Sequence, residues 1–432
     1  MEQNHEKPKI SKIPYIGGEP VPGTCLETVY KRARAETLFA MFRNGTVQYV
    51  PSFASRDTEV LTPYPPTNNL IRNRVILFPS AADEYDTKEA LVAEIRSYLH
   101  RYVTISPVFE NIAAYYILLT WIYDGFATLP YLRARGDFGS GKTRFLTVVG
   151  SLCFRAIFAG ATTASPLFRM LDSFRGTLVI DEGDFRYSDE QSDIAKILNN
   201  GNSKGFPVLR SEQAGNGKVF NPVAYTVFGP KVIATRGFYD DPALESRFIS
   251  EDMGRNRPRA DMPLHLPESF QEEAEKLRNK LLMFRFRNLH QYSVTENIEG
   301  LLEPRISQIF APLLSVVGDD ERDEILGLIR EYSAELSLDR SGNIEQYVVE
   351  AIKELWTGEA LPLKAITMKL NEKYRDDFQE LASSRRVGFV VRRQLNIRTR
   401  RRGGVFEILP SEDGRIQALF GRFGVMTEEQ AG

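Results

Sequence analysis

The sequence has 432 residues, of which 42% are apolar and 26% are charged, and these values are ordinary for folded proteins. This composition excludes a fibrous or largely disordered chain, and the length predicts two or three domains. Lys and Arg number 55 against 57 Asp and Glu, so the net charge of −2 excludes a generally basic nucleic-acid-binding protein.

Residues 1–85 form a small region rich in proline and glycine. Within it, the pair Asn44-Gly45 favours a tight hairpin turn between strands at 36–42 and 47–53. The region contains no recognisable primase or zinc-ribbon signature, so no role in DNA recognition is assigned to it.

Two helices are predicted in residues 86–125. Asp86, followed three residues later by Glu89, favours a helix start, and apolar periodicity continues to about residue 103. Ser106 followed by Pro107 predicts the start of a second helix, which ends near Gly125. We expect this pair to form a helical collar ahead of the next domain.

Residues 126–262 alternate short apolar strands with helices, which predicts a parallel sheet flanked by helices. Between a strand at 129–135 and a helix at 143–154, the chain matches G-x-x-x-x-G-K-[ST] at every fixed position. Glycines let such a loop turn its N–H groups towards phosphates, and the helix N-terminus adds positive potential. Lys142 would reach the β- and γ-phosphates of ATP, and the Thr143 hydroxyl would bind Mg²⁺. The loop consists of Gly136, Asp137, Phe138, Gly139, Ser140, Gly141, Lys142 and Thr143.

A second buried strand, at 177–182, ends in two acids, Asp181 and Glu182. In a parallel sheet, its carboxyl end is expected at the edge that also carries the phosphate loop. Asp181 would hold Mg²⁺ through water, and Glu182 would activate the attacking water as a general base. An apolar run ending in two acids often marks only a strand end, but its position after a complete phosphate loop favours hydrolysis.

Two more polar positions follow in the same domain. A strand at 231–234 ends in Thr235, whose side chain would sense the γ-phosphate. Arg247 follows a short helix and would enter the active site of a neighbouring subunit, where it would neutralise transition-state charge. A surface salt bridge is the alternative for this arginine.

In this order, the four motifs resemble the Walker A, Walker B, sensor 1 and arginine-finger elements of AAA+ ATPases. An insertion at 205–229 resembles the pre-sensor-1 hairpin of superfamily 3 and minichromosome-maintenance-like replicative helicases of mobile genetic elements. The resemblance implies that Lys218, at the hairpin tip, follows single-stranded DNA through the channel of a ring. One lysine per subunit gives a hexamer a ring of positive charge suited to a phosphate backbone. An ordinary surface hairpin is the alternative.

Two positions bear on how closely the chain follows this family. The family usually places Asn where this chain has Thr235. A sensor 2 arginine is expected in a helical lid, residues 263–335, where Arg305 is the chosen candidate and Arg278 and Arg285 are others.

Residues 340–412 have a pattern of their own. Helices are predicted at about 344–355, 363–374 and 385–395, followed by two strands around Gly403-Gly404, which together indicate a winged helix-turn-helix. Residues 361–410 carry 12 Lys and Arg against five acids, so the near-neutral whole chain hides a basic module. We expect contact with duplex or forked DNA, with subunit packing against an acidic partner as the alternative. The predicted DNA contacts are Arg385, Arg386, Arg392, Arg393, Arg400, Arg401 and Arg402, and Arg398 belongs to the same cluster.

The sequence does not predict a structural metal site, a disulfide framework or a membrane protein. The two cysteines and four histidines lack zinc-site spacing, so neither a structural metal nor a disulfide framework is expected. The longest apolar stretch, residues 113–123, is about half of what a membrane span needs, and residues 1–12 lack a signal-peptide core. We therefore expect a cytoplasmic protein without a membrane partner.

The sequence thus predicts an α/β P-loop AAA+ core with an N-terminal helical collar and a C-terminal winged helix-turn-helix. The functional hypothesis is an ATP- and Mg²⁺-dependent, ring-forming DNA helicase or translocase for the replication of a mobile genetic element. It would be a hexamer that acts on single-stranded and forked or duplex DNA. A helicase loader or replication initiator without unwinding activity, and an ATP-switched DNA-binding regulator, remain alternatives.

Overall fold

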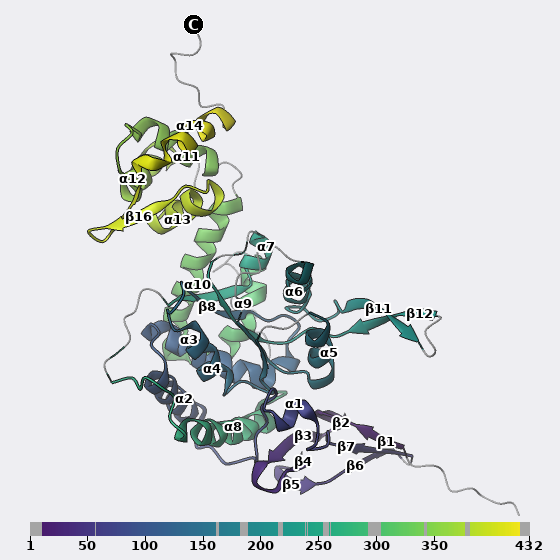
Figure 1. Cartoon of the computed structure of the whole chain (residues 1–432). Coiled ribbons are helices and arrows are strands. Elements are labelled where there is room, and N and C mark those ends of the chain that lie inside the picture. Colours follow the sequence, from purple (N-terminus) through teal and green to yellow (C-terminus); the bar gives the residue numbers. More distant parts are fainter. Residues whose placement is uncertain are drawn as a thin grey trace, which may run out of the picture. The chain divides into compact units, whose positions relative to one another are not determined.

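The computed structural model describes twelve stretches of the chain, and the structural statements below refer to them. They are residues 11–56, 58–160, 164–181, 189–214, 219–237, 239, 241–253, 259, 261–292, 304–340, 344–375 and 381–423. The chain divides into two compact units, residues 1–326 and 327–432, which are described separately (Figure 1).

The N-terminal residues form two small sheets. One has the antiparallel order β2-β3-β4-β5, and the other has the order β1-β7-β6, in which β1 and β7 are parallel. The predicted hairpin turn is confirmed, since Asn44 and Gly45 join β4 to β5 with φ angles of 52° and 76°. The strands are β1 (Ser11–Pro14), β2 (Gly17–Val21), β3 (Thr24–Lys31), β4 (Glu36–Arg43), β5 (Thr46–Val50), β6 (Phe53–Arg56) and β7 (Glu59–Thr62).

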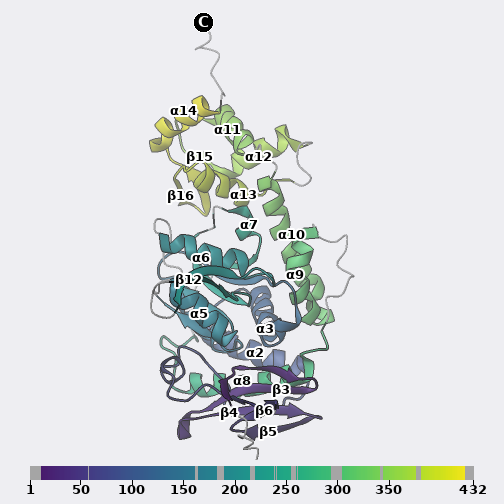
Figure 2. The same cartoon turned by 90° about the vertical axis from the view of Figure 1, so that its right-hand side faces the viewer.

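A five-stranded parallel sheet forms the centre of the first unit. Its order is β14-β8-β13-β10-β9, and each neighbouring pair is parallel. Helices α5 and α6 cover one face, while α3 and α4 cover the other, so the strands are apolar on both faces (Figure 2). This confirms the predicted parallel sheet flanked by helices. The elements are β8 (Tyr131–Arg135), α4 (Lys142–Gly150), β9 (Ile157–Ala159), α5 (Ala164–Phe174), β10 (Leu178–Asp181), α6 (Asp189–Asn200), β13 (Lys231–Thr235), α7 (Pro242–Glu245) and β14 (Phe248–Asp252).

The two helices expected as a collar belong instead to the α/β core. Both predicted starts are close to the observed ones: α2 (Lys88–Tyr102) is capped by Thr87 rather than Asp86, and α3 (Pro107–Ile122) is capped by Ser106. However, α3 has no polar face that water could cover, and it is buried along almost its whole length. The hydroxyl of Tyr116 donates to the carbonyl of Lys231 at the start of β13, at 2.9 Å. Helices α2 and α3 therefore do not form a separate collar.

The helices that follow the sheet pack around α3. Helix α8 (Ser269–Asn288) contacts α2 and α3, and α9 (Pro304–Val316) contacts α3. The side chains of Leu281, Leu282 and Phe284 on α8 are all fully buried. Helix α8, which belongs to the predicted helical lid, is thus packed into the core. A short helix, α1 (Asn69–Arg72), precedes α2, and α10 (Asp319–Arg340), which the sequence analysis did not predict, contains the division between the two units.

The insertion between β10 and β13 contains the predicted pair of strands. Strands β11 (Val208–Ala214) and β12 (Val219–Tyr225) pair antiparallel from Val208 with Tyr225 to Ala214 with Val219. Figure 1 shows this hairpin projecting from the α/β core. Residues 215–218, which include Lys218, lie outside the described residues.

The C-terminal unit has the predicted helices and strands around one apolar core. Its strands form a three-stranded antiparallel sheet in the order β15-β17-β16. Residues Gly403 and Gly404 form the turn between β16 and β17, with φ angles of 56° and 86°. The elements are α11 (Ile344–Leu355), β15 (Leu361–Pro362), α12 (Leu363–Lys373), α13 (Ser384–Phe389) with a π-helical turn (Val390–Gln394), β16 (Thr399–Arg402), β17 (Val405–Ile408) and α14 (Asp413–Arg422).

Within the described part of the chain, none of the helices combines the length and apolar character required to cross a membrane.

Candidate functional site

Three strands of the parallel sheet end side by side at one edge. The register pairs Arg135 of β8 with Thr235 of β13, and it pairs Ala234 of β13 with Asp181 of β10. Parallel α/β sheets bind ligands at this carboxyl edge. The phosphate-loop sequence leaves the sheet here, and the backbone N–H of Gly136 donates to the carbonyl of Thr235 at 3.2 Å. The fold therefore gathers at one edge three motifs that are far apart in the sequence.

Two glycines with left-handed backbone angles curl the loop between β8 and α4. Gly139 has φ of 76° and Gly141 has φ of 92°, a conformation that other residues adopt only under strain. A Cβ atom at Gly139 would meet nothing within 4 Å, so the backbone angle, and not space, requires glycine there. Gly141 immediately precedes α4, whose first N–H groups lack intrahelical partners. The loop thus presents the positive end of a helix at the sheet edge, which favours phosphate.

The hydroxyl of Thr143 donates a hydrogen bond to the carboxylate of Asp181, with 2.9 Å between Oγ1 and Oδ2. This contact joins the first turn of α4 to the end of β10. The Nζ atom of Lys142 donates to the carbonyls of Gly136 and Asp137, both at 2.7 Å, so the ammonium group lies over the loop itself. An ammonium, a hydroxyl and a carboxylate therefore converge within a few residues of the curled backbone.

These groups fit a magnesium–nucleotide complex. Mg²⁺ prefers oxygen ligands and is usually held by one or two protein oxygens together with substrate phosphates and water. Thr143 and Asp181 supply two such oxygens, and the α4 N-terminus with Lys142 supplies charge for phosphates. Asp181 is only partly buried, which leaves it open to a ligand. Glu182, the predicted general base, lies outside the described residues.

The side chain of Thr235 lies at the correct edge but is turned into its own loop. It is 5% exposed, and its hydroxyl donates to the carbonyl of Gly237 at 2.8 Å. The predicted role as a γ-phosphate sensor would require that bond to break. The backbone carbonyl of Thr235, rather than its hydroxyl, therefore contacts the phosphate loop.

Arg247 lies at the opposite edge of the sheet. It directly precedes β14, which pairs with β8 from its first residue, Phe248 with Tyr131. At a rise of about 3.3 Å per residue, a five-residue strand separates the two edges by roughly 15 Å, too far for Arg247 to reach the phosphate loop of its own chain. Its guanidinium donates to the Asn199 side chain and to the Leu198 carbonyl at the end of α6.

A buried ion pair fixes the segment before Arg247. The guanidinium of Arg133 on β8 donates to both carboxylate oxygens of Glu245 on α7, with 2.8 Å for the longer contact. Burial raises the pKa of Glu245, but the charge of Arg133 and the hydrogen bonds that the carboxylate accepts from Arg133 and from the Tyr239 backbone together lower it by more, so its pKa lies below the usual value. The pair remains ionised and holds α7 against the sheet.

A further charged pair, which was not predicted from the sequence, lies at the phosphate-loop edge. Asp252, the last residue of β14, is 3.4 Å from the guanidinium of Arg135, and the next backbone N–H, of Met253, donates to the Arg135 carbonyl at 2.7 Å. The preceding acid, Glu251, accepts bonds from the N–H and hydroxyl of Ser106 and so fixes the start of α3. The available signal was the pair Glu251-Asp252 at the end of a short strand, as at Asp181-Glu182, but only two apolar residues, Phe248 and Ile249, stand in that strand.

Two of the three sensor 2 candidates have other roles. Arg278 donates to the carbonyls of Ser151 and Phe78, and Arg285 is buried against Glu27 and Asp124. Both are therefore excluded from a nucleotide contact. Arg305, the preferred candidate, is the second residue of α9, and its role stays a prediction.

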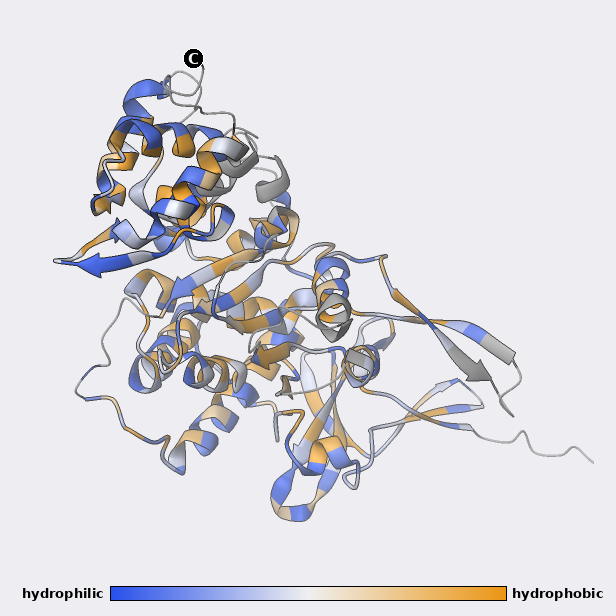
Figure 3. Ribbon diagram, turned by 45° about the horizontal axis from the view of Figure 1, so that its top comes forward, coloured by the Kyte–Doolittle hydropathy of each residue, from blue (hydrophilic) through white to orange (hydrophobic). Residues whose placement is uncertain are grey.

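The arginines of the C-terminal unit differ in exposure. Arg386 is only 4% exposed, because it lies on the side of α13 that faces the core together with Val387, and it is removed from the predicted DNA contacts. Arg400 pairs with Glu407 at 3.3 Å, and the guanidiniums of Arg392 and Arg401 lie over the ring of Phe406, at 5.2 and 5.9 Å from its centroid. Strand β16 is hydrophilic along its length (Figure 3). The exposed members of the predicted set are Arg385, Arg392, Arg400, Arg401 and Arg402, and the side chain of Arg393 lies outside the described part.

No protein-family model and no curated protein matches the chain. Among solved structures, similarity was found to the apo C-terminal region of NrS-1, with 9% identity, coverage of 89% of this chain and 96% of that one, and a TM-score of 0.29. A full-length MCM homolog from Methanopyrus kandleri has 11% identity, coverage of 72% and 69%, and a TM-score of 0.35. The JCV helicase has 14% identity, coverage of 57% and 61%, and a TM-score of 0.24. These values are too low for the similarities to support a functional conclusion.

Proposed function

We propose that the chain is an ATP-driven DNA helicase or translocase of the AAA+ class that works as a ring. The observation that carries this proposal is the 2.9 Å contact between the Thr143 hydroxyl and the Asp181 carboxylate, beside a glycine loop at a helix N-terminus. A phosphate loop alone would serve nucleotide binding. A carboxylate held against its last residue adds the means to place a metal ion, which hydrolysis needs.

Each residue of the site would have a separate role in ATP binding and hydrolysis. The loop N–H groups and Lys142 would bind the ATP phosphates, and Thr143 and Asp181 would hold Mg²⁺. When bound, the metal would neutralise charge that develops on the phosphate oxygens. Glu182 would accept the proton of the attacking water.

Ring assembly is supported by the position of Arg247 at the sheet edge away from its own phosphate loop. In a head-to-tail ring, the edge of the sheet that carries Arg247 would meet the edge of the next subunit that carries the phosphate loop. Arg247 would leave Asn199 and neutralise transition-state charge in that neighbour. A hexamer and a role in replicating a mobile genetic element follow from the family resemblance of the motifs.

The β11–β12 hairpin supports movement along DNA. Its ladder pairs seven residues of each strand, and Lys218 lies in the sequence directly before β12. One such lysine from each subunit would face the strand in a ring and bind its phosphates in a salt-dependent manner.

The decisive experiment is the ATPase rate of the full chain with and without single-stranded DNA. We expect DNA to stimulate the wild type, and we expect Lys218→Ala to lose that stimulation while keeping the basal rate. Lys12→Ala, which removes an exposed lysine of β1, is the control and should behave as wild type. ATPase activity that DNA never stimulates would favour the ATP-switched regulator, and stimulation without strand displacement on a forked substrate would favour the loader.

The C-terminal unit is proposed to be a winged helix-turn-helix that binds duplex or forked DNA. Its order of α11, β15, α12, α13, β16 and β17 supports this, with α13 as the helix for the major groove and the β16–β17 hairpin as the wing. Arg401 and Arg402 on β16 are exposed and would bind phosphates.

The double substitution Arg401→Ala/Arg402→Ala should weaken binding of the full chain to forked DNA. Each phosphate contact contributes about 0.9 to the slope of log K against log salt, so the slope should fall by about 2. Lys369→Ala/Lys373→Ala removes the same charge from α12, where both lysines pair with Glu354, and should leave the slope unchanged. Fluorescence anisotropy over a salt series measures both variants, and equal slopes for all three proteins would contradict the prediction.

A further inference from the structure

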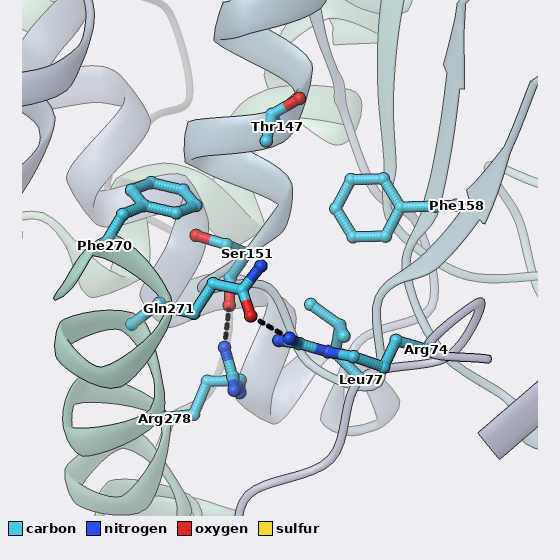
Figure 4. Close-up of a pocket in the computed structure, with 9 residues that line it drawn as sticks. Arg74, Leu77, Thr147, Ser151, Phe158, Phe270, Gln271 and Arg278 are labelled. Atoms are coloured by element: carbon cyan, nitrogen blue, oxygen red, sulfur yellow. Dashed lines mark hydrogen bonds between the residues drawn. The ribbon is translucent and has the colours of Figure 1, made fainter. Parts of the chain in front are cut away.

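A small cavity lies between α4, α8, β9 and the segment that follows α1. Its volume is about 210 Å³, below the 300 Å³ or so at which pockets for drug-sized ligands begin. The rings of Phe158 and Phe270 lie on either side of it, and Arg74 and Arg278 lie at its lower end in Figure 4. The remaining lining residues are Leu77, Thr147, Ser151, Gln271 and Ala274.

The two arginines give the cavity a positive end. Arg74 donates to the side-chain oxygen of Gln271, and Arg278 donates to the backbone carbonyls of Ser151, at 2.7 Å, and Phe78, at 3.4 Å. No acidic residue lines the cavity among the residues that the structure describes. The two guanidinium groups therefore face an apolar space without a carboxylate between them.

The surroundings of Arg278 differ from those of other buried arginines in this unit. Arg133 pairs with Glu245, whereas Arg155 and Arg285 both pair with Glu27. Arg278 is 2% exposed, yet no carboxylate of the described chain pairs with it. Burial lowers the pKa of Arg278 to about 10, because the opposing charge of Glu275 does not outweigh it, and the charge of Arg74 acts in the same direction as burial. A buried cation in this state gains from an anion more than an exposed one does.

Arg74 is held in an unusual backbone conformation that directs it to this place. Its φ angle is 57°, in the left-handed region that costs a non-glycine residue free energy. The N–H of Arg74 bonds to the carbonyl of Ile71, and Gln271 of α8 holds the guanidinium. Helix α8 and the segment after α1 therefore fix the two guanidinium groups at one end of the cavity.

We propose that this cavity binds a small organic anion, a phosphate or carboxylate group on an apolar body, through the guanidinium groups of Arg74 and Arg278. The apolar body lies between Phe158 and Phe270, and the anionic group accepts charge-assisted hydrogen bonds from the two arginines. The site is distinct from the phosphate loop, because it lies at the other end of α4, where Thr147 and Ser151 line it.

Phenyl phosphate is a suitable probe, and isothermal titration calorimetry on the full chain measures its binding. The phosphate loop also attracts phosphate, so the titrations use the Lys142→Ala variant, which weakens that competing site. We expect one binding event in this background. Arg74→Gln, added to it, should weaken binding by about 10-fold or more, as expected for the loss of a charge-assisted hydrogen bond.

Matched variants separate the cavity from the general surface. Arg72→Gln removes an exposed arginine two residues away and should leave the affinity unchanged. Gln271→Glu keeps the shape of an exposed side chain but places a carboxylate against Arg74, and it should abolish binding without unfolding the chain. Benzyl alcohol, which lacks the charge, should not bind measurably. Absence of phenyl phosphate binding, equal affinity in Arg74→Gln, or equal binding of benzyl alcohol would each overturn the proposal.

Discussion

Asp181→Asn and Thr143→Val should each lower kcat for ATP hydrolysis by about 100- to 1,000-fold, the usual effect of removing one preorganised group that stabilises transition-state charge. The two side chains are 2.9 Å apart and would bind the same metal ion. Thr143→Val removes the hydroxyl oxygen that would bind the ion, and Asp181→Asn removes the negative charge that would hold the ion through water. A steady-state ATPase assay at saturating ATP and Mg²⁺ measures the effect.

The double variant tests whether the two residues act as a unit. Groups that act together are strongly non-additive, so Thr143→Val/Asp181→Asn should be little slower than the worse single variant. Multiplicative losses would indicate two independent roles and would contradict a shared metal ion. The comparison also needs each variant to be folded, which the melting temperature checks.

Asp172→Asn is the matched control for the acid. Asp172 also accepts a single described hydrogen bond, from the backbone of Thr226 at 2.9 Å, but it belongs to α5 rather than to the edge where the phosphate loop lies. It should keep an ATPase rate close to that of the wild type. A loss as large as that of Asp181→Asn would mean that any acid substitution in this unit disturbs the site.

The phosphate loop could be predicted because its signals are local. Gly139 and Gly141 are needed for the backbone angles of the loop itself, and the strand and helix beside it are short periodic patterns. The same holds for the Asn44-Gly45 turn and for the Ser106 cap. In each case the residues that determine the conformation are neighbours in the sequence.

The N-terminal sheets and the packing of α3 could not be predicted, because they depend on distant partners. Strand β1 pairs with β7, which lies more than 40 residues further along the chain, and both strands are only four residues long. The apolar sequence of α3 showed that it would be buried but not which surface would cover it. Likewise, basic runs locate a charged module, but only packing shows that Arg386 faces inward.

The largest predicted loss of stability arises from a glutamate that no sequence motif identifies. Glu27 lies in the middle of β3 and is 1% exposed. Its carboxylate accepts bonds from Arg155, which follows α4, and from Arg285 of α8 at 2.7 Å. Both guanidiniums also lie over the ring of Phe154, each 4.5 Å from its centroid. This cluster ties the N-terminal sheets to the α/β core.

Charge balance in the cluster depends on Glu27. Burial on its own would lower the pKa of Arg285, but Asp124 and Glu27 raise it well above its usual value, so this guanidinium stays charged. Without Glu27, Arg155 keeps no described carboxylate partner, and Arg285 keeps only Asp124. Leaving a buried charge uncompensated costs about 3–5 kcal/mol.

Glu27→Ala should therefore lower the free energy of unfolding of the first unit by about 3–5 kcal/mol. Trp121 is fully buried in this unit, and Arg285 donates to its backbone carbonyl at 2.6 Å. Its fluorescence therefore reports on the surroundings of the cluster. Urea unfolding followed by Trp121 fluorescence, in a Trp356→Phe background that removes the tryptophan of the second unit, measures the change.

The control is an exposed ion pair in which one partner, Arg287, lies on α8, as Arg285 does. Glu84 pairs with Arg287, two residues beyond Arg285, and the two side chains are 70% and 40% exposed. Glu84→Ala should cost no more than about 1 kcal/mol, since exposed pairs contribute little. If Glu27→Ala costs no more than this control, the buried cluster does not hold the N-terminal sheets to the core.

A second substitution identifies the origin of the loss. If stability is lost because the Arg155 guanidinium remains buried without a carboxylate partner, removing that guanidinium should recover part of the lost stability. Glu27→Ala/Arg155→Met should then be more stable than the sum of the two single effects predicts, by about 0.5–3 kcal/mol of coupling. Simple additivity would instead assign the loss to packing around β3, because the two side chains would then contribute independently.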